Sequence, residues 1–358
     1  MILEELRGLR VLMLTASYHP RAGGVEKHVR CVARELRAMG LEIWVATPRW
    51  EEGWDEEELV DGVMVRRLST NMRAGRRELE PLLDWAQVVH THDAYPFLKY
   101  YLPYAVRRPR LPVFVTWHGY ECYPIPLEAK ILRRLVGLRT KGCICAGAFI
   151  AKWYKIRCGR ITYGGVDAPE QRPLLGEGAC FIGRLERDTG ILEYIEALAL
   201  LRNRYGIELP VEVCGSGSLR ELAERRAAER GLRATFHGQV ADPMPYFMRA
   251  RFACVSGYLA MLEAMAGGAI VLALYDNPLK EDYLRMSPMA VHAVIAGSPE
   301  ELAERTAALA HAPEEMRRRA AAAYEFAREQ TWRKVAELYA GLYAQWFARR
   351  RHSWLLRS

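Results

Sequence analysis

Short apolar runs alternate with helical patterns along this chain, and the alternation occurs twice. In the first half the runs lie at residues 10–15, 42–47, 88–91, 113–117 and 143–146. The first run, RVLMLT, has the length and apolar character of a buried parallel strand. Helical or loop stretches separate the runs, the first helix being expected over residues 27–39. This order predicts βαβ units and a parallel sheet.

The same pattern restarts after residues 168–177, a polar stretch with two prolines and Gly176 that is typical of a linker. Strand-like runs follow at residues 179–182, 211–214, 234–237, 252–255, 270–274 and 291–295, with helical patterns at 191–205, 219–230 and 258–266. From residue 299 the chain is helical, and it ends in an amphipathic run from 332 to about 350. The sequence predicts two α/β domains joined near residue 168.

Length and composition agree with two packed domains. The 358 residues are 51% hydrophobic and 26% charged, which argues against disorder. No apolar run approaches the roughly 18 residues of a transmembrane helix, and the acidic N-terminus does not resemble a signal peptide. We therefore expect the protein to stay on the cytoplasmic side of the membrane. The eight cysteines form no Cys-x-x-Cys pair and are predicted to be buried free thiols.

The chain is basic, with a net charge of +8 carried mainly by arginine clusters in the first half and at residues 349–351. This charge indicates either a solvated surface or an anionic partner. No nucleic-acid-binding motif accompanies it. Aromatic residues stand beside the C-terminal cluster, namely Trp346, Phe347 and Trp354. They favour contact with an acidic membrane face over contact with nucleic acid.

Two glycines follow the first strand, where open α/β sheets bind ligands. Gly23 and Gly24 let the backbone approach a ligand, and the N–H groups of the next helix can hold a phosphate. An ordinary turn is the alternative interpretation.

Histidines follow two further strands. His118 is the side chain near its strand end that could exchange a proton near neutral pH, although a structural hydrogen bond is an alternative role. The strand end that contains His90, His92 and Asp93 resembles part of a metal site. No third ligand stands at a suitable spacing from it, which argues against a metal. No Asp-x-Asp pair ends a strand, so we expect catalysis without a metal.

In the second half, Arg184 follows a strand and is suited to clamp a pyrophosphate by bidentate hydrogen bonds. Gly215 and Gly217 lie between another strand and a helix. Glu263 lies in a mostly apolar helix, where its carboxylate needs a partner. A ribose diol and an arginine are the two alternatives.

Taken in order, these motifs resemble glycosyltransferase family 4, whose members are retaining enzymes with the GT-B fold. The resemblance covers nearly the whole chain. The segments that carry it are YHP at 18–20 with GGVE at 23–26, VHTHD at 89–93, TWHG at 116–119, GGVD at 164–167, FIGRL at 181–185 and LEAMA at 262–266. It implies two Rossmann-like domains facing each other across a cleft, at residues 1–167 and 168–334, with the final helix 335–358 packing back on the first.

The resemblance also implies roles for individual residues. His118 would contact the transferred sugar, Arg184 the diphosphate and Glu263 the ribose hydroxyls. Further donor-site residues would be Gly23, Gly24, Arg187, Gly215, Gly217, Ser256, Gly257 and Tyr258. The acceptor side would include Tyr18, His19, His92 and Asp93. The donor would be a UDP- or GDP-sugar, and no metal or other cofactor would be required.

Two positions depart from the family pattern. The family usually has a glutamate where Val255 stands and a lysine where Thr189 stands. Arg187 or Lys280 could replace the lost positive charge, or the backbone N–H groups of residues 256 and 257 could bind the phosphate. Alternatively, the site is degenerate. We favour compensation, because the other donor-side residues are all present.

The sequence therefore predicts a retaining hexosyltransferase acting on a hydroxyl acceptor, with a lipid-linked acceptor favoured by the basic charge. A catalytically silent nucleotide-sugar-binding protein is the first alternative. A sugar-nucleotide epimerase is the second, although such an enzyme needs several carboxylates as acid and base. The sugar, the nucleotide base and the oligomeric state are left open.

Overall fold

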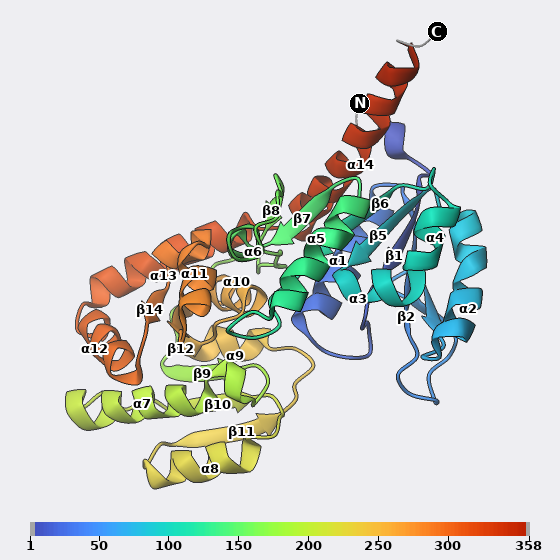
Figure 1. Ribbon diagram of the computed structural model, residues 1–358. Coiled ribbons are helices and arrows are strands. Elements are labelled where there is room, and N and C mark those ends of the chain that lie inside the picture. The colour runs from blue at the N-terminus through green and yellow to red at the C-terminus, as the bar shows by residue number, and fades with distance from the viewer. Residues whose placement is uncertain (1–3, 356–358) are drawn as a thin grey trace. The chain divides into compact units, whose positions relative to one another are not determined.

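The chain folds into two compact units, each with its own parallel sheet (Figure 1). The computed structural model describes residues 4–355, except the side chains of residues 5 and 350–355. Unit 1 comprises Met1–Gly164 and Trp332–Ser358, and unit 2 comprises Gly165–Thr331. Within the described residues, no helix is both long and apolar enough to cross a membrane.

Unit 1 contains an eight-stranded sheet in the order β3-β4-β2-β1-β5-β6-β7-β8. Neighbouring strands are parallel except β3 and β4. The strands are β1 (Arg10–Leu14), β2 (Glu42–Pro48), β3 (Glu57–Val60), β4 (Val63–Leu68), β5 (Val88–His92), β6 (Val113–Trp117), β7 (Cys143–Ala146) and β8 (Ile161–Thr162). The helices are α1 (Gly24–Ala38), α2 (Met72–Trp85), α3 (Ala94–Pro96), α4 (Leu102–Arg107), α5 (Leu127–Arg139), α6 (Ala148–Tyr154) and α14 (Trp332–Leu355).

The structure contains a hairpin of β3 and β4 that was not among the strands expected in the first half of the chain. Asp61 and Gly62 at its turn both have positive φ, 49° and 76°. An Asp-Gly pair is the usual sequence of such a tight hairpin turn, so a local signal was present. Strand β3 has the sequence EELV and was not predicted, because it is not an apolar run. Only its last residue is buried, so the other positions do not need to be apolar.

Unit 2 contains a six-stranded, wholly parallel sheet in the order β11-β10-β9-β12-β13-β14. The strands are β9 (Gly178–Ile182), β10 (Val211–Cys214), β11 (Ala234–Gly238), β12 (Ala250–Cys254), β13 (Ile270–Leu274) and β14 (Val294–Ala296). The helices are α7 (Ile191–Tyr205), α8 (Arg220–Glu229), α9 (Met244–Arg249), α10 (Tyr258–Ala266), α11 (Pro278–Arg285), α12 (Pro299–Ala310) and α13 (Pro313–Arg328).

The last strand of unit 2 begins later than predicted. We expected it over residues 291–295, but Pro288–Val291 forms a 3-10 turn and β14 starts at Val294. Pro288 favours this turn because its fixed φ suits the first position of a helical segment.

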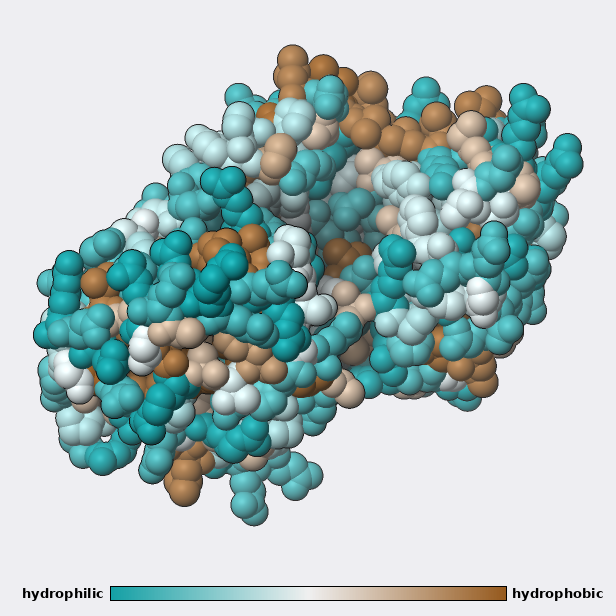
Figure 2. All heavy atoms as spheres, turned by 90° about the horizontal axis from the view of Figure 1, so that it is seen from below, coloured by the Kyte–Doolittle hydropathy of each residue, from teal (hydrophilic) through white to brown (hydrophobic). Residues whose placement is uncertain are grey.

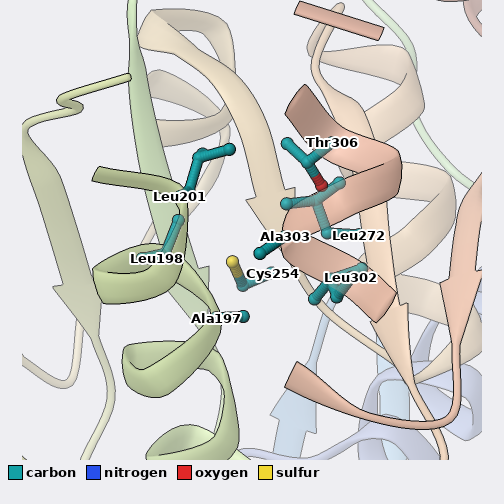
Figure 3. Close-up of a pocket in the computed structure, with 8 residues that line it drawn as sticks. All are labelled: Ala197, Leu198, Leu201, Cys254, Leu272, Leu302, Ala303 and Thr306. Atoms are coloured by element: carbon teal, nitrogen blue, oxygen red, sulfur yellow. The ribbon is translucent and has the colours of Figure 1, made fainter. Parts of the chain in front are cut away.

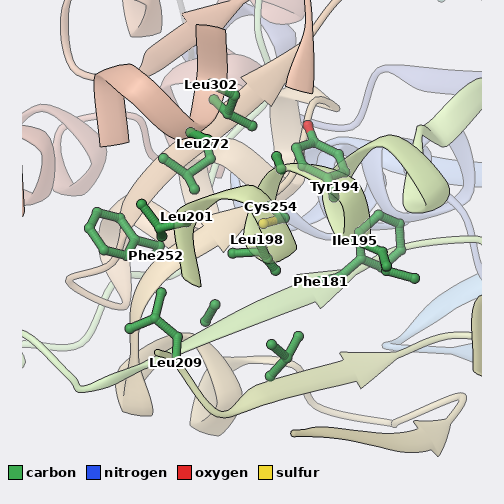
Figure 4. Packing of buried hydrophobic residues seen from close by; sticks show 14 of the residues in the cluster. Phe181, Tyr194, Ile195, Leu198, Leu201, Leu209, Phe252, Cys254, Leu272 and Leu302 are labelled. Carbon is green, nitrogen blue, oxygen red and sulfur yellow. The ribbon is translucent and has the colours of Figure 1, made fainter. Parts of the chain in front are cut away.

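The core of unit 2 lies between its sheet and the helices α7 and α12 (Figure 4). Phe181, Leu201, Phe252 and Leu272 are almost completely buried there. A small cavity in the same core is lined almost entirely by apolar side chains (Figure 3). Its lining offers only the Thr306 hydroxyl for hydrogen bonding, so we interpret it as a packing gap. The solvent-facing surface is mainly hydrophilic with separate apolar groups, as Figure 2 shows for one face.

Candidate functional site

Three loops of unit 1 meet at the carboxyl ends of β1, β5 and β6, which are neighbours in the sheet. The loop after β1 leads into Gly23 and Gly24, β5 ends at His92, and His118 follows β6. The structure brings His92, Asp93 and His118 into direct contact. Because parallel strands present their carboxyl ends at one edge, this grouping follows from the strand order.

The two histidines share a hydrogen bond. His92 Nδ1 and His118 Nε2 lie 3.0 Å apart, and their rings are stacked. The His118 backbone N–H donates to Asp93 Oδ1 at 2.8 Å. Asp93 itself has a φ of 67° and a ψ of 178°, a strained backbone conformation that is nearly confined to glycine. The Asp93 carboxylate thus fixes the backbone that carries the His118 ring.

Burial sets the charge of this group. The pKa of His118 is lowered well below 6.5, chiefly by burial and then by electrostatic interactions with His28, His90 and Arg133. The pKa of His92 is lowered for the same main reason. The expectation that His118 exchanges a proton near neutral pH is therefore wrong, because burial keeps the ring neutral. A neutral ring can still donate or accept a hydrogen bond.

A polar network extends from these histidines into α14. His90 Nδ1 lies 2.8 Å from the Tyr343 hydroxyl, and His90 Nε2 lies 2.8 Å from Thr116 Oγ1. Thr116 Oγ1 donates to the Tyr339 hydroxyl at 2.8 Å, and that hydroxyl lies 3.0 Å from His28 Nε2. Sequence reasoning missed His28 and both tyrosines, because their partners stand more than 200 positions away along the chain.

Tyr18 and His19 have other partners than the histidine group. Tyr18 is buried, and burial raises the pKa of its phenol while Arg30 and Arg67 lower it. The carbonyl oxygen of His19 accepts a hydrogen bond from Arg67 Nη2 at 2.9 Å. This hydrogen bond attaches the loop after β1 to β4, which contains Arg67 and is separated from β1 by β2 in the sheet.

Gly23 and Gly24 form the start of α1. Gly23 precedes the helix with extended backbone, and no side chain caps the first turn. A Cβ atom at Gly23 would lie within 2.2 Å of Glu26 Oε2, whereas a Cβ atom at Gly24 would meet open space. The space beside Gly24 at a helix start is a feature of an anion-binding loop, and the Glu26 carboxylate lies on the side of Gly23.

The glycines after β10 have a structural explanation. A Cβ atom at Gly215 would lie 1.8 Å from the Gly183 carbonyl oxygen, and one at Gly217 would lie 2.3 Å from the Leu185 carbonyl oxygen. The loops after β9 and β10 therefore touch backbone to backbone. Their contact extends the parallel pairing of the two strands beyond their ends, with Leu185 N–H donating to the Ser216 carbonyl at 2.9 Å.

Arg184 stands exposed at the end of β9. Its Nη2 donates to Asp188 Oδ2 at 2.6 Å, and both side chains are more than 60% exposed. Such an exposed pair holds its partners only weakly, so the guanidinium can turn to a ligand. Arg187 is exposed on the same short turn. Thr189 Oγ1 donates to the carbonyl oxygens of Arg184 and Glu186, both at 2.7 Å, and so fixes the backbone of this turn.

Lys280 joins this region from α11. Its Nζ donates to the Ser256 carbonyl at 3.4 Å and lies 4.7 Å from the centre of the Tyr283 ring. Burial lowers the pKa of Lys280 to about 8, the carboxylates of Asp188 and Asp276 raise it, and Arg184 lowers it. Ser256 follows β12, which is the neighbour of β9, so Lys280 and Arg184 lie at the same carboxyl edge of the sheet. Two cationic side chains therefore converge at this edge of unit 2.

The start of α10 is partly occupied by another side chain. The Tyr258 backbone N–H donates to the Tyr283 hydroxyl at 3.0 Å, and the two rings are stacked 4.0 Å apart. No side chain caps the helix from Gly257. Glu263 is buried one and a half turns further on. Among the described residues, no group of three or more His, Cys, Asp or Glu side chains is arranged to hold a metal ion.

Comparison with known families decides what kind of protein carries these loops. The family model for Glycosyltransferase Family 4 matches residues 22–168, and that for Glycosyl transferases group 1 matches residues 172–326. The chain belongs to glycosyltransferase family 4. The two matches fall on the two α/β units in the order that the motifs predicted. No curated protein sequence matches this glycosyltransferase.

Solved structures confirm the GT-B fold of the glycosyltransferase. Sucrose-phosphate synthase from Thermosynechococcus elongatus has a TM-score of 0.73 at 17% identity, covering 95% of this chain and 100% of that chain. Anabaena HepE in complex with UDP and glucose has a TM-score of 0.69 at 15% identity, covering 94% and 100%. An E. coli trehalose-6-phosphate structure bound with UDP-2-fluoro glucose has a TM-score of 0.68 at 12% identity, covering 94% and 99%.

Proposed function

We propose that the glycosyltransferase moves a hexose from a UDP- or GDP-sugar to a hydroxyl acceptor, with retention at the anomeric carbon and without a metal. The convergence of Arg184 and Lys280 at the strand ends of unit 2 carries the proposal. A departing nucleoside diphosphate needs concentrated positive charge, and these two side chains supply it. Four of the similar structures contain UDP or a UDP-sugar, which favours uracil over guanine.

Each proposed role follows from a side chain's chemistry. Arg184 binds the diphosphate through its planar fork, and Lys280 adds a second charge in place of the lysine missing at Thr189. The Glu263 carboxylate accepts hydrogen bonds from the ribose hydroxyls. His118, kept neutral by burial, hydrogen-bonds a hydroxyl of the transferred sugar. No side chain is assigned as a covalent nucleophile.

The acceptor is proposed to be a lipid-linked hydroxyl, reached by an enzyme that stays on the cytoplasmic side and binds a membrane peripherally. The basic charge of the chain supports this part of the proposal. Of the C-terminal residues considered earlier, Trp346 and Phe347 are half-buried, and Trp346 contacts Phe114. Arg349 is exposed. The side chains of Arg350, Arg351 and Trp354 lie outside the described residues.

Calorimetry with UDP, GDP and ADP tests the donor site and identifies the base. We expect the wild-type protein to bind UDP, and we expect Arg184→Ala and Glu263→Ala to lose both nucleotide binding and donor turnover. Removing one charge-assisted contact costs about 2 kcal/mol, or roughly thirtyfold in affinity. Arg318→Ala is the matched control, because Arg318 is a highly exposed arginine on α13 whose partner is Glu315.

Full binding and turnover in both donor-site variants would show that the donor site is misplaced. A protein that binds UDP but turns over no sugar nucleotide would support the catalytically silent alternative. Conversion of a nucleotide sugar into its epimer, detected by NMR, would support the epimerase. We favour transfer over these two alternatives because the cationic pair is retained despite the two substitutions at positions 189 and 255.

A further inference from the structure

The helix α5 of unit 1 has its apolar side directed outward. Leu127, Ile131, Leu135 and Leu138 recur at helical spacing along one face and are between 47% and 81% exposed. Leu132 adjoins them and is also exposed. A surface helix of a globular protein normally buries its apolar stripe, so this orientation is the reverse of the usual one. Contiguous exposed apolar side chains mark an interaction surface.

The inward side of α5 explains why the helix takes this orientation. Arg133 is buried and lies over the Tyr154 ring, with its guanidinium 3.9 Å from the ring centre. Its Nη2 donates to Glu121 Oε1 at 2.9 Å and to the His118 carbonyl at 3.3 Å, and its Nη1 donates to the Gly119 carbonyl at 3.3 Å. A charged group buried with this many partners fixes the rotation of the helix about its axis. The outward leucines are therefore held in place.

The charge around α5 is strongly positive. Residues 102–164 contain 12 lysines and arginines but only two acidic residues, Glu121 and Glu128. Glu121 is already paired with Arg133. By helical spacing, the exposed Arg134 lies at one border of the apolar face and the exposed Arg139 at the other, where the exposed Glu128 also lies. Leucines in the centre with cations at the border are typical of a helix that lies in the interface of an anionic bilayer.

Aromatic side chains lie at the beginning of the same face. Tyr123 precedes α5 by four residues, is 44% exposed and contacts Trp153 of α6 edge to face. Helix α6 packs against α5 and carries the exposed Lys152, with the exposed Lys155 following its end. Tyrosine and tryptophan favour the boundary between hydrocarbon and head groups. The surface formed by α5, Tyr123 and α6 thus combines three independent features of membrane contact.

We propose that the outward face of α5 is the surface by which this protein binds an anionic lipid bilayer. Arg133 joins this face to the loop of His118. Binding would therefore place the proposed sugar-contacting loop beside lipid-borne hydroxyls, a consequence that rests on the proposed function. A second copy of the chain fits the face less well. Two such surfaces would bring the same excess of positive charge together, whereas anionic head groups neutralise it.

Vesicle co-sedimentation tests the surface without any assay of transfer. The vesicles contain phosphatidylglycerol and phosphatidylcholine at about 3:7, with pure phosphatidylcholine as the neutral comparison. We expect the wild-type chain to sediment with the anionic vesicles at low salt and to be released at high salt. Leu135→Glu with Leu138→Glu is expected to reduce the partition coefficient by about tenfold or more. Both side chains are exposed, so folding should be preserved.

The matched control is Leu174→Glu with Val291→Glu, which replaces two apolar side chains of unit 2 that are 85% and 77% exposed. It is expected to bind vesicles like the wild type. Equal binding by the helix variant and the control would overturn the proposal, as would no binding by the wild type. A wild-type dimer that the helix variant converts to monomer without vesicle binding would assign the face to self-association and overturn it too.

Nucleotide binding separates this proposal from the proposed function. The helix variant is expected to retain wild-type affinity for UDP in calorimetry, because its substitutions lie outside the donor site. A wild-type protein that binds vesicles through α5 but neither binds UDP nor transfers sugar would leave the surface standing and refute only the proposed donor binding and sugar transfer.

Discussion

At the scale of single residues, Lys280 supplies the positive charge that a lysine at position 189 would otherwise provide. Thr189 uses its hydroxyl to hold two carbonyl oxygens of its own turn. A lysine there would lose these hydrogen bonds. Lys280 comes from another helix and brings its ammonium group to the Ser256 carbonyl near Arg184. The positive charge is therefore present, but it is supplied by a residue about ninety positions further along the chain.

Lys280 predicts how UDP binding depends on pH. Burial lowers its pKa to about 8, so the ammonium form is lost as the pH rises through that value. We expect affinity for UDP, measured by calorimetry, to fall between pH 7 and pH 9. Lys280→Met should weaken binding by about tenfold at pH 7 and remove most of this dependence.

Lys280→Arg provides the matched control, because arginine stays charged across this range. It should bind UDP with little change between pH 7 and pH 9. The same fall in affinity in the arginine variant would show that another group causes the pH dependence.

At the scale of elements, α14 completes the interior of unit 1. Tyr339 and Tyr343 are fully buried and hydrogen-bond to histidines of α1 and β5. A parallel strand such as β5 is usually apolar throughout, yet its last residues are His90, Thr91 and His92, all buried. The Tyr343 hydroxyl of α14 pairs with His90 Nδ1, which this strand would otherwise bury without a partner.

The buried histidines predict acid sensitivity. Burial lowers the pKa of His28 to about 4 and that of His90 to about 3, from 6.5 in the unfolded chain. Below pH 6.5 the unfolded chain binds protons that the folded chain excludes, so stability falls as the pH falls. For His28 alone the loss is about 2 kcal/mol between pH 7.5 and pH 5. Thermal unfolding followed by fluorescence measures it.

Asp93 opposes this trend, because burial raises its pKa to about 6 and the folded chain gains a proton there. On acidification, the stability lost through the buried histidines is larger than the stability gained through this one carboxyl group. His28→Gln should unfold earlier than the wild type at pH 7.5 but lose less stability on acidification. An unfolding temperature that is independent of pH between 7.5 and 5 would contradict the neutral, buried state of these rings.

At the scale of the whole molecule, the two units differ in how the chain forms them. Unit 2 is one continuous segment, Gly165–Thr331, whereas unit 1 needs Trp332–Ser358 from the other end of the chain. We expect a fragment of residues 165–331 to fold and to bind UDP with nearly the affinity of the full chain, since its core is its own. Circular dichroism and calorimetry check both statements.

A fragment of residues 1–164 provides the comparison. It lacks α14, which leaves the histidines of β5 and α1 without their tyrosine partners. We expect this fragment to be unfolded or aggregated, and adding α14 through a linker should restore folding. A stable, cooperatively unfolding fragment of 1–164 would show that α14 contributes little.

Much of this protein is determined by local sequence patterns. Apolar runs of strand length separated by helical patterns predicted the two α/β units, because strands buried on both faces must be apolar. Strand ends also indicated that His118 lies at the carboxyl edge of the sheet, since parallel strands direct their carboxyl ends to one edge. The ordered motifs predicted the glycosyltransferase family, which the comparisons confirm.

Only the tertiary structure decided the remaining features, because they depend on residues far apart in sequence or on the direction of a helix face. Spacing could not show that Lys280 approaches Arg184, or that α14 supplies hydroxyls to the buried histidines. The apolar residues of α5 have the same periodicity whether they face a core or the solvent. Buried Arg133, held by the loop of His118, determines that they face outward.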